Sequence, residues 1–258
     1  AQENLFAALR AAFPANLDLI AVETDHGLNY TWRDLDRASA MMANLLNGLN
    51  LPKGSRIAVQ VEKSVEAVML YLATLRAGYV FLPLNTAYQS SEIEYFIGNA
   101  EPAVVVCSGA NFGWVSKIAF KAGTQHVFTL NDDRTGTLLE RAAHQKDQHK
   151  VVLQNADDLA AILYTSGTTG LPKGCMHTHG TIMHNAMSSG LWANGTPENK
   201  CLCVVPMFHI TGMVSVMHAT IFMGATLILM PRWDRDLAGR LISKWKVTHW
   251  TNIPTMVI

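Results

Sequence analysis

The stretch that decides the fold is Tyr164-Thr165-Ser166-Gly167-Thr168-Thr169-Gly170-Leu171-Pro172-Lys173-Gly174. An apolar run, Leu159 to Leu163, precedes it and predicts a buried strand. Glycines allow successive backbone N–H groups to point at one anion, because no Cβ restricts the backbone there. The hydroxyl groups add donors, Lys173 adds a positive charge, and Pro172 restricts the direction in which the chain leaves the loop. The stretch therefore predicts a loop that binds a polyphosphate.

This loop differs from a Walker A loop, in which Gly-Lys is followed by Ser or Thr. Here Lys173 follows Pro172 and precedes Gly174. The alternative is a polar surface turn, but the ordered set of hydroxyls, glycines and lysine disfavours it. Residues Gly174 to His179 predict a second strand, which would place the loop at the tip of a hairpin.

Composition limits the classes of function. The chain has 258 residues, 49% of them hydrophobic, and can bury a sizeable core. Twenty Lys and Arg balance twenty Asp and Glu, so no overall field favours nucleic acid or an anionic membrane. No signal peptide opens the sequence and no apolar run reaches membrane-spanning length, so we expect a cytoplasmic protein. The four cysteines each lie in or beside an apolar run and are expected to be buried free thiols rather than disulfides, with a Cys201–Cys203 metal pair as a further alternative.

Short apolar runs alternate with segments in which apolar residues recur at helical spacing. This alternation predicts an α/β fold with mostly parallel sheets flanked by helices. Expected helix starts are Thr31 with Asp34, Ser64, and Ser91 with Glu94. After the loop, the expected strands are Cys201–Val205, Ala225–Met230 and His249–Ile253, and the expected helices are Thr181–Trp192, Gly212–Met223 and Asp234–Lys246.

Residues Leu163–Gly174 resemble the signature of the AMP-forming acyl-adenylate superfamily: acyl-CoA synthetases, luciferases and adenylation domains of peptide synthetases. The resemblance covers nearly the whole chain. Leu28–Ala43 and Leu75–Asn85 are similar to the first two sequence blocks of that superfamily, and Pro206–Met213 to the block that borders the carboxylate pocket. It implies the N-terminal large domain of an acyl-adenylate-forming enzyme.

The resemblance implies an ATP-dependent acyl-CoA synthetase. A carboxylate would attack the α-phosphate of ATP, and the thiol of coenzyme A would then displace AMP. The implied ligands of the β- and γ-phosphates are Thr165, Ser166, Gly167, Thr168, Thr169, Gly170 and Lys173, and Lys173 is also a catalytic candidate. Thr168 is the candidate for positioning Mg²⁺.

The second implied part of the site is the carboxylate pocket. His209 is a catalytic candidate near the reacting carboxylate, Phe208 would pack along the substrate, and Gly212 would complete the pocket. A His between apolar residues is by itself more often a core histidine, but the loop favours the pocket interpretation. Amino-acid adenylation domains carry an Asp at the place of His209, so an amino-acid substrate is disfavoured.

Two substrate classes stay open, fatty acids and malonate. Glu62–Ala67, Leu82–Tyr88 and Ala156–Tyr164 resemble malonyl-CoA synthetases. Pro206–Met213 and the apolar segment after it resemble medium- or long-chain fatty-acid–CoA ligases, and monocarboxylates are favoured. Met213, Met217 and Met223 could line an acyl tunnel, although methionines at this spacing more often fill a core.

We expect residues 1–158 to form a first α/β subdomain and residues 159–258 to hold the loop and an incomplete second subdomain. The adenine-binding block, ribose-binding aspartate and C-terminal domain of the superfamily do not occur in this sequence, which predicts a catalytically incomplete N-terminal part. The alternative is a non-catalytic chain that binds nucleotide. An uncovered sheet edge near His249–Ile253 predicts a homodimer.

A further candidate is a metal cluster of His177, His179 and His184. His177 and His179 would share one face of a strand, but no carboxylate or cysteine completes an obvious set of ligands. Ordinary polar positions beside the loop are the favoured interpretation.

Overall fold

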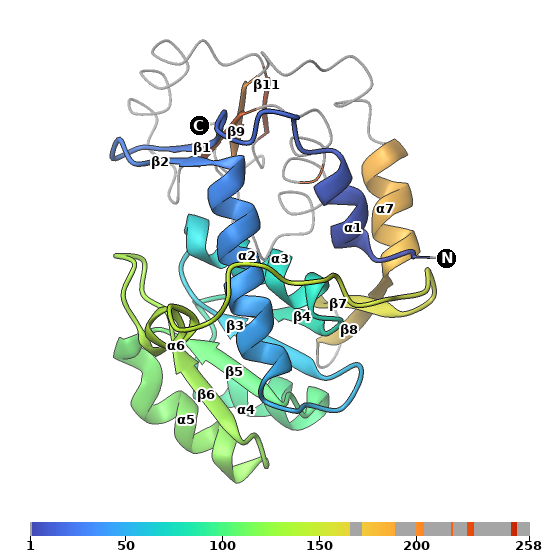
Figure 1. The fold of residues 1–258 in the computed structure, drawn as a ribbon. Coiled ribbons are helices and arrows are strands. Elements are labelled where there is room, and N and C mark those ends of the chain that lie inside the picture. Colours follow the sequence, from blue (N-terminus) through green and yellow to red (C-terminus); the bar gives the residue numbers. More distant parts are fainter. Residues whose placement is uncertain are drawn as a thin grey trace. The chain divides into compact units, whose positions relative to one another are not determined.

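The computed structural model describes residues 2–165, 172–188, 200–203, 218, 226–229 and 249–251. The chain divides into two compact units, each with its own sheet. The first unit consists of Ala1–Phe6 and Ala38–Gly180, and the second of Ala7–Arg37 and Thr181–Ile258. Figure 1 labels most of the elements of both.

The first unit contains a six-stranded sheet in the order β6-β5-β3-β4-β7-β8. Neighbouring strands are parallel except for the edge strand β8, which is antiparallel to β7. The strands are β3 (Arg56–Gln60), β4 (Val80–Pro83), β5 (Val104–Cys107), β6 (His126–Thr129), β7 (Leu159–Thr165) and β8 (Lys173–Thr178). The helices of this part are α3 (Val65–Arg76), α4 (Ser90–Ala100), the 3-10 turn η1 (Gly109–Asn111), α5 (Phe112–Lys121) and α6 (Thr137–Ala142).

The second unit contains a five-stranded sheet in the order β11-β9-β10-β1-β2. Its strands are parallel except for the edge strand β2, which is antiparallel to β1. The strands are β1 (Ile20–Thr24), β2 (Asn29–Thr31), β9 (Lys200–Cys203), β10 (Thr226–Leu229) and β11 (His249–Thr251). Helices α1 (Leu5–Ala11), α2 (Trp32–Asn47) and α7 (His179–Ser188) each cross a boundary between the units. The three strands expected after the loop therefore form as β9, β10 and β11, which are parallel to one another in the same sheet.

The division into units differs from the expected boundary between residues 158 and 159. Strands β7 and β8 complete the sheet of the first unit, because Ala161 of β7 pairs with Phe81 of β4. The early strands β1 and β2 belong to the other sheet, since Val22 pairs with Leu227 of β10. Long-range strand pairing of this kind leaves no signal in the local sequence pattern.

Helix starts follow the expected capping chemistry at two of three places. Thr31 Oγ1 accepts a hydrogen bond from the Asp34 N–H at 3.1 Å, while the Thr31 N–H donates to Asp34 Oδ2 at 2.9 Å. Ser64 Oγ accepts from the Ala67 N–H at 3.1 Å. The expectation of Ser91 with Glu94 was wrong: α4 starts two residues earlier, where the Gln89 N–H donates to Glu92 Oε2 at 2.9 Å. Glu92 makes the reciprocal bond that was expected of Glu94, two residues earlier in the chain.

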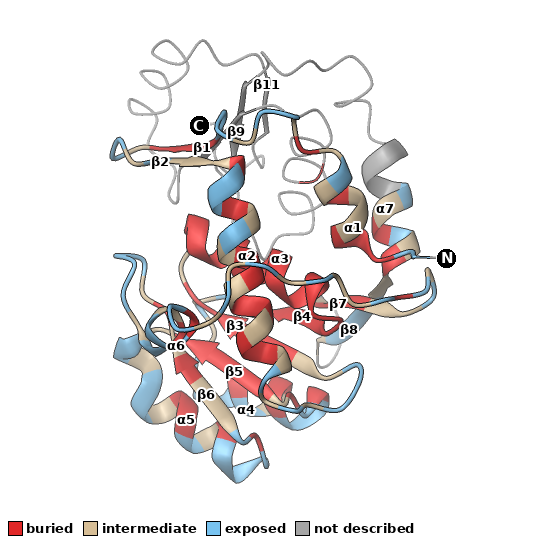
Figure 2. Cartoon of the chain, viewed as in Figure 1, coloured by how far each residue is buried: buried red, intermediate tan, exposed pale blue. Residues whose placement is uncertain are grey.

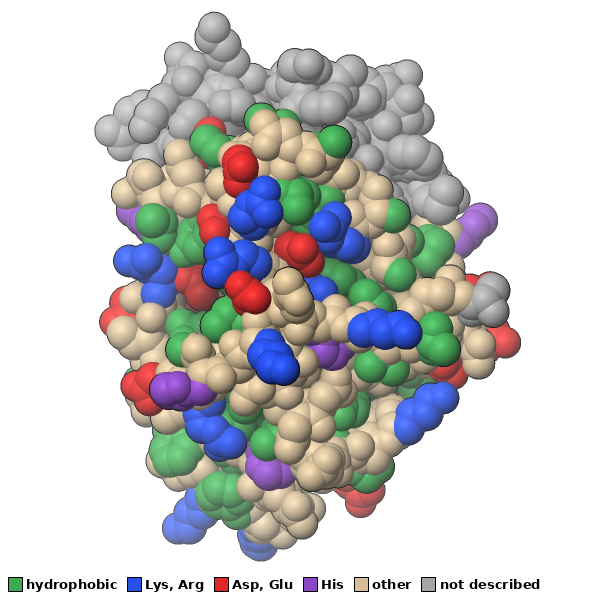
Figure 3. All heavy atoms as spheres, viewed as in Figure 1, with side chains coloured by type: hydrophobic (Ala, Val, Ile, Leu, Met, Phe, Trp, Pro, Cys, Tyr) green, Lys and Arg blue, Asp and Glu red, His purple; other side chains and the backbone are tan. Residues whose placement is uncertain are grey.

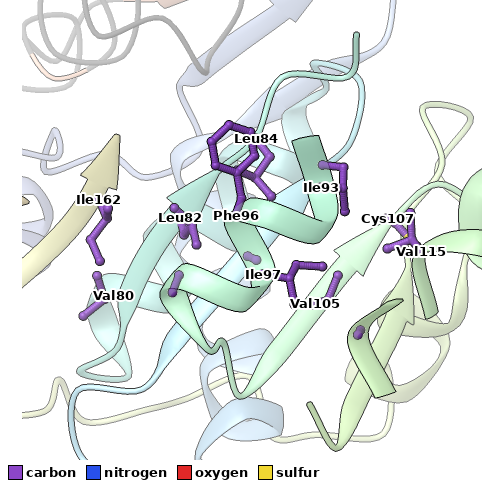
Figure 4. Close-up of a cluster of buried hydrophobic side chains, with 13 residues drawn as sticks. Val80, Leu82, Leu84, Ile93, Phe96, Ile97, Val105, Cys107, Val115 and Ile162 are labelled. Atoms are coloured by element: carbon purple, nitrogen blue, oxygen red, sulfur yellow. The ribbon is translucent and has the colours of Figure 1, made fainter. Parts of the chain in front are cut away.

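One apolar cluster joins the sheet of the first unit to α4. Phe96 and Ile97 of α4 lie against Val80 and Leu82 of β4 and Ile162 of β7 (Figure 4). Helix α3 and the inner strands β4 and β5 are buried along their whole length, and so is β3 apart from Arg56 (Figure 2). Parallel strands covered on both faces explain why these segments are continuous apolar runs.

Some predicted elements lie partly or wholly outside the described residues. Helix α7 replaces the expected helix Thr181–Trp192 and starts two residues earlier, at His179. The predicted helices Gly212–Met223 and Asp234–Lys246 fall almost entirely in the part that is not described.

Candidate functional site

Strands β7 and β8 form the hairpin expected around the glycine-rich stretch. Thr165 is paired with Lys173, Tyr164 with Gly174 and Leu163 with Cys175, all in antiparallel register. Residues 166–171, which connect the two strands, lie outside the described residues. The pairing holds Thr165 and Lys173, the strand residues that flank this connection, next to each other.

Helix α4 contacts both strands at the base of this loop. The Tyr164 hydroxyl donates a hydrogen bond to Asn99 Oδ1 at 2.6 Å. The Tyr95 hydroxyl donates to the backbone carbonyl of Pro172, the residue before β8, at 3.0 Å. Helix α4 therefore holds Tyr164 at the end of β7, before the loop, and Pro172, after it.

The same place is packed by aromatic rings around Phe96. Ring centroids lie 4.4 Å from Phe96 to Tyr164, 4.8 Å from Phe96 to Tyr88 and 5.5 Å from Phe96 to Tyr95. Tilted and edge-on pairs at these distances are favourable beyond the area that they bury. The cluster fixes the Tyr164 ring in addition to its hydroxyl.

The electrostatics at the loop base keep the Tyr164 hydroxyl a donor. Burial raises the pKa of Tyr164 above its usual value, nearby Tyr95 raises it further, and the Arg56 guanidinium opposes this rise. Because the hydroxyl stays protonated at neutral pH, it can donate to the Asn99 amide oxygen under all physiological conditions.

Lys173 stands at the mouth of the loop with an exposed side chain. Gly174, Cys175 and Met176 of the same edge strand are exposed too. The face drawn in Figure 3 mixes Lys and Arg with Asp and Glu, as the balanced composition predicts. The balanced net charge gives no overall cationic field, so the charge that Lys173 contributes beside the loop is a local one.

The candidate histidine cluster, the disfavoured interpretation, does not assemble as a metal site, and His179 lies at the start of α7 and not on the strand with His177. His179 is buried, and its Nδ1 accepts a hydrogen bond from the Leu5 N–H at 2.9 Å, while His184 is exposed on α7. Burial lowers the pKa of His179 to about 4 and also lowers that of His177. Within the described ranges, no three His, Cys, Asp or Glu side chains are grouped to hold a metal ion. His179 is a structural acceptor at the start of α7.

The structure places the predicted site residues unevenly. Lys173 and the backbone of Thr165 are described, and they are paired across the hairpin. Ser166, Gly167, Thr168, Thr169 and Gly170 of the loop, and Phe208, His209 and Gly212 of the predicted pocket, lie outside the described residues. Tyr95 and Asn99 were not predicted from the sequence. Their spacing of four residues, which places both on one face of a helix, is the sequence feature that could have related them to each other.

Two further predictions meet the structure here. The expected buried free thiol is confirmed for Cys107. The expectation of burial is wrong for Cys175, which is exposed because it lies on the edge strand β8. The Cys201 and Cys203 side chains are not described. Burial raises the pKa of Cys107 to about 12. Of the helices described, none is long and apolar enough to cross a membrane.

Comparison with known proteins defines the family. The model of the AMP-binding enzyme family matches residues 9–258, and the chain belongs to this family. The long-chain-fatty-acid–CoA ligase FadD13 of Mycobacterium tuberculosis is 29% identical over 241 residues, which cover 92% of this chain and 46% of FadD13. The chain spans about half the length of the curated relatives that it matches.

Solved structures agree with this assignment. Apo MatB from Rhodopseudomonas palustris matches with a TM-score of 0.93 and 37% identity, over 99% of this chain and 50% of MatB. The N-terminal domain of FACL13 from Mycobacterium tuberculosis matches with a TM-score of 0.85 and 26% identity, over 99% of this chain and 64% of that domain. The predicted fold, an α/β N-terminal part of an adenylate-forming enzyme, is confirmed.

Proposed function

We propose that the protein containing this chain is an AMP-forming acyl-CoA ligase, which activates a carboxylic acid with ATP and transfers the acyl group to coenzyme A. The observation that carries the proposal is the β7–β8 hairpin, which brings Thr165 and Lys173 together at the two ends of the glycine- and hydroxyl-rich loop. Family membership and relatives named as fatty-acid–CoA ligases support the same reaction.

The first step makes a mixed anhydride. A carboxylate oxygen forms a bond to the α-phosphorus of ATP, the bond to the bridging oxygen breaks, and pyrophosphate leaves with that electron pair. Lys173 would stabilise the negative charge that grows on the leaving pyrophosphate, and the loop N–H and hydroxyl groups of residues 166–170 would hold the β- and γ-phosphates. In the second step the sulfur of coenzyme A attacks the acyl carbon, and AMP leaves.

Mg²⁺ would neutralise charge on the phosphates when it is bound. Mg²⁺ in such sites is usually held by one or two protein oxygens together with substrate phosphates and water. Thr168 is the proposed protein hydroxyl beside the metal, in the loop between the two strands.

The carboxylate pocket is proposed around Phe208, His209 and Gly212. We expect His209→Ala to raise the KM for the carboxylate at least about tenfold, since one lost hydrogen bond to a charged group is worth about 1.5–3 kcal/mol. ATP binding should change little. Separate titrations of ATP and carboxylate against the variant would check this, and a loss confined to ATP binding would contradict the pocket assignment.

The carboxylate itself is proposed to be a fatty acid, with malonate as the competing substrate. Similarity alone supports these two substrate classes, since the relatives include long- and medium-chain fatty-acid–CoA ligases and the structural neighbours include MatB. Equal concentrations of octanoate, palmitate and malonate, assayed separately for thioester formation, would separate the two classes. The predicted homodimer stays a prediction that light scattering can test.

Labelled oxygen tests the reaction directly. With an ¹⁸O-labelled carboxylate, ATP, Mg²⁺ and coenzyme A, the full-length protein should transfer one labelled oxygen to AMP, because the carboxylate oxygen bonded to phosphorus stays with AMP. Formation of ADP and phosphate, or of unlabelled AMP, would refute the proposal. Nucleotide binding without turnover would instead favour the non-catalytic alternative.

A further inference from the structure

We infer that Tyr95 and Asn99 of α4 are positioning residues that hold the phosphate-binding loop ready for ATP. The inference rests on the proposed function, because it assigns these two side chains to the same loop. Neither residue lies in the glycine-rich stretch. Asn99 is 65 positions in sequence from Tyr164, which it contacts, and Tyr95 is 77 positions from Pro172.

The two side chains act on different strands of the hairpin. Asn99 accepts from the Tyr164 hydroxyl on β7 at 2.6 Å, one residue before Thr165. Tyr95 donates to the Pro172 carbonyl at 3.0 Å, one residue before Lys173 on β8. Residues four apart lie above each other on one face of a helix, so a single stripe of α4 reaches both ends of the loop.

Helix α4 is fixed strongly enough to serve as a reference point. Its buried side chains Ile93, Phe96, Ile97 and Ala100 pack in the core cluster of the sheet. At its C-terminus Arg56 Nη1 donates to the Ala100 carbonyl at 2.9 Å, where a cation also complements the helix dipole. The Phe96 ring lies between those of Tyr88 and Tyr164, so the stripe that carries Tyr95 and Asn99 has little freedom to move.

Fixing the loop ends should matter for ATP more than for the carboxylate. A loop must give up conformational freedom when its N–H groups converge on a phosphate, and each residue ordered in advance lowers that cost at binding. The register that pairs Thr165 with Lys173 also sets where the lysine ammonium lies relative to the loop. Loss of either hydrogen bond should therefore weaken the ATP interaction without removing any group that touches the substrate.

The test is steady-state ATP–pyrophosphate exchange in the full-length protein. Tyr95→Phe and Asn99→Leu should each raise the KM for ATP about 3- to 10-fold, the range expected for one neutral hydrogen bond. The KM for the carboxylate should stay within about twofold. Asn99→Asp keeps an oxygen that accepts from Tyr164, so it should keep the wild-type KM for ATP. Asn99→Leu has nearly the same shape but no acceptor, so a purely steric role of Asn99 would predict an unchanged KM for both variants.

Two controls separate positioning from general destabilisation. Tyr88→Phe changes a tyrosine in the same aromatic cluster whose hydroxyl makes no hydrogen bond within the described part of the chain, and it should leave the KM for ATP unchanged. Combining Asn99→Leu with Tyr164→Phe should cost no more than the worse single variant, because both remove the same bond.

The outcomes distinguish the two claims. If the wild-type protein exchanges no pyrophosphate with any carboxylate, the proposed function fails and the positioning role fails with it. If the wild-type protein is active and Tyr95→Phe and Asn99→Leu both keep its KM for ATP, only the positioning role is overturned. An equal rise in both KM values, unrescued by Asn99→Asp, would also overturn it.

Discussion

Two hairpins in the described part of the chain put an antiparallel strand at the edge of a parallel sheet, and they are closed in different ways. The β1–β2 hairpin closes through its own short turn: the Gly27 N–H donates to the Thr24 carbonyl at 3.2 Å, and Thr24 Oγ1 donates to the Leu28 carbonyl at 2.6 Å. The β7–β8 hairpin has a longer connection, residues 166–172, and its base is held by side chains of α4. A turn that only reverses the chain can be satisfied locally, whereas a loop that must leave its N–H groups available for a ligand needs support from outside.

The largest effect is expected when the positive charge of Lys173, which follows the loop of the β7–β8 hairpin, is removed. Lys173→Ala should lower the rate of adenylate formation at least about 100-fold, because a preorganised group that stabilises charge in the transition state is worth about 3–4 kcal/mol. Pyrophosphate exchange in the full-length protein measures it. The matched change in the other hairpin, His26→Ala, should leave that rate unchanged, and an unchanged rate for Lys173→Ala would contradict the role of the loop.

The next effect concerns the far end of the β7–β8 hairpin, where His179 follows β8. Burial lowers the pKa of His179 to about 4, which Asp158 opposes, so the unfolded chain binds a proton more readily than the folded one. The stabilisation from neutral His179 is therefore complete above about pH 6.5 and is lost as pH falls towards 4, by up to about 3 kcal/mol. Urea unfolding between pH 7 and 4 should show this loss.

His179→Asn tests that origin, because its amide oxygen can accept from the Leu5 N–H without titrating in this range. The variant should lose less stability on acidification than the wild type does. Part of the pH dependence should remain, since burial and nearby Arg76 also lower the pKa of His149 to about 4. His184→Asn, at an exposed position of α7, is the control and should follow the wild type. Identical slopes in all three proteins would exclude His179 as the source.

The third prediction addresses the self-closed turn. Gly27 has φ of +89° with no atom within 4 Å of an added Cβ, so Gly27→Ala is limited by backbone conformation and not by space. It should lower the free energy of unfolding by about 1–2 kcal/mol. Gly98→Ala, in open space on helix α4, should instead raise it by about 0.5–1 kcal/mol. Equal changes in the two variants would show that the turn does not depend on its positive φ.

The smallest effect concerns the glycine opposite Tyr164. A Cβ at Gly174 would lie 3.1 Å from Ile162 Cγ2, so that side chain must shift by a few tenths of an ångström, whereas Tyr164 Cε1 at 3.4 Å is at ordinary contact distance. Ile162 and Tyr164 share one face of β7, and we expect the shift of Ile162 to disturb the Tyr164 ring and its bond to Asn99 only slightly. Gly174→Ala should therefore raise the KM for ATP at most about twofold to fivefold, within the range of one neutral hydrogen bond. A KM equal to that of the wild type would mean that the loop base tolerates this movement.

Local chemistry explains what could be predicted from the sequence. The hairpin around the glycine-rich stretch and the caps at Thr31 and Ser64 depend on residues close together in the chain, and all of them form. The start of α4 was missed because Gln89 is not a usual capping residue, although its N–H bond to Glu92 gives the same closure.

Long-range contacts could not be predicted in the same way. The bonds from Tyr95 to Pro172 and from Tyr164 to Asn99 depend on which strands become neighbours in the sheet. The same holds for the grouping of β1 with β10, which moves the boundary between the units away from residue 158. The roles of Thr168, Phe208 and His209 stay predictions.

The most direct test of the account is a structure of the full-length protein with Mg²⁺ and a non-reactive ATP analogue that has a methylene bridge between its α- and β-phosphates. The account predicts that the β- and γ-phosphates lie against residues 166–170, within hydrogen-bonding distance of Lys173 Nζ, while Tyr95 and Asn99 keep their bonds to Pro172 and Tyr164. A triphosphate bound away from the β7–β8 hairpin, with Lys173 out of reach, would contradict it.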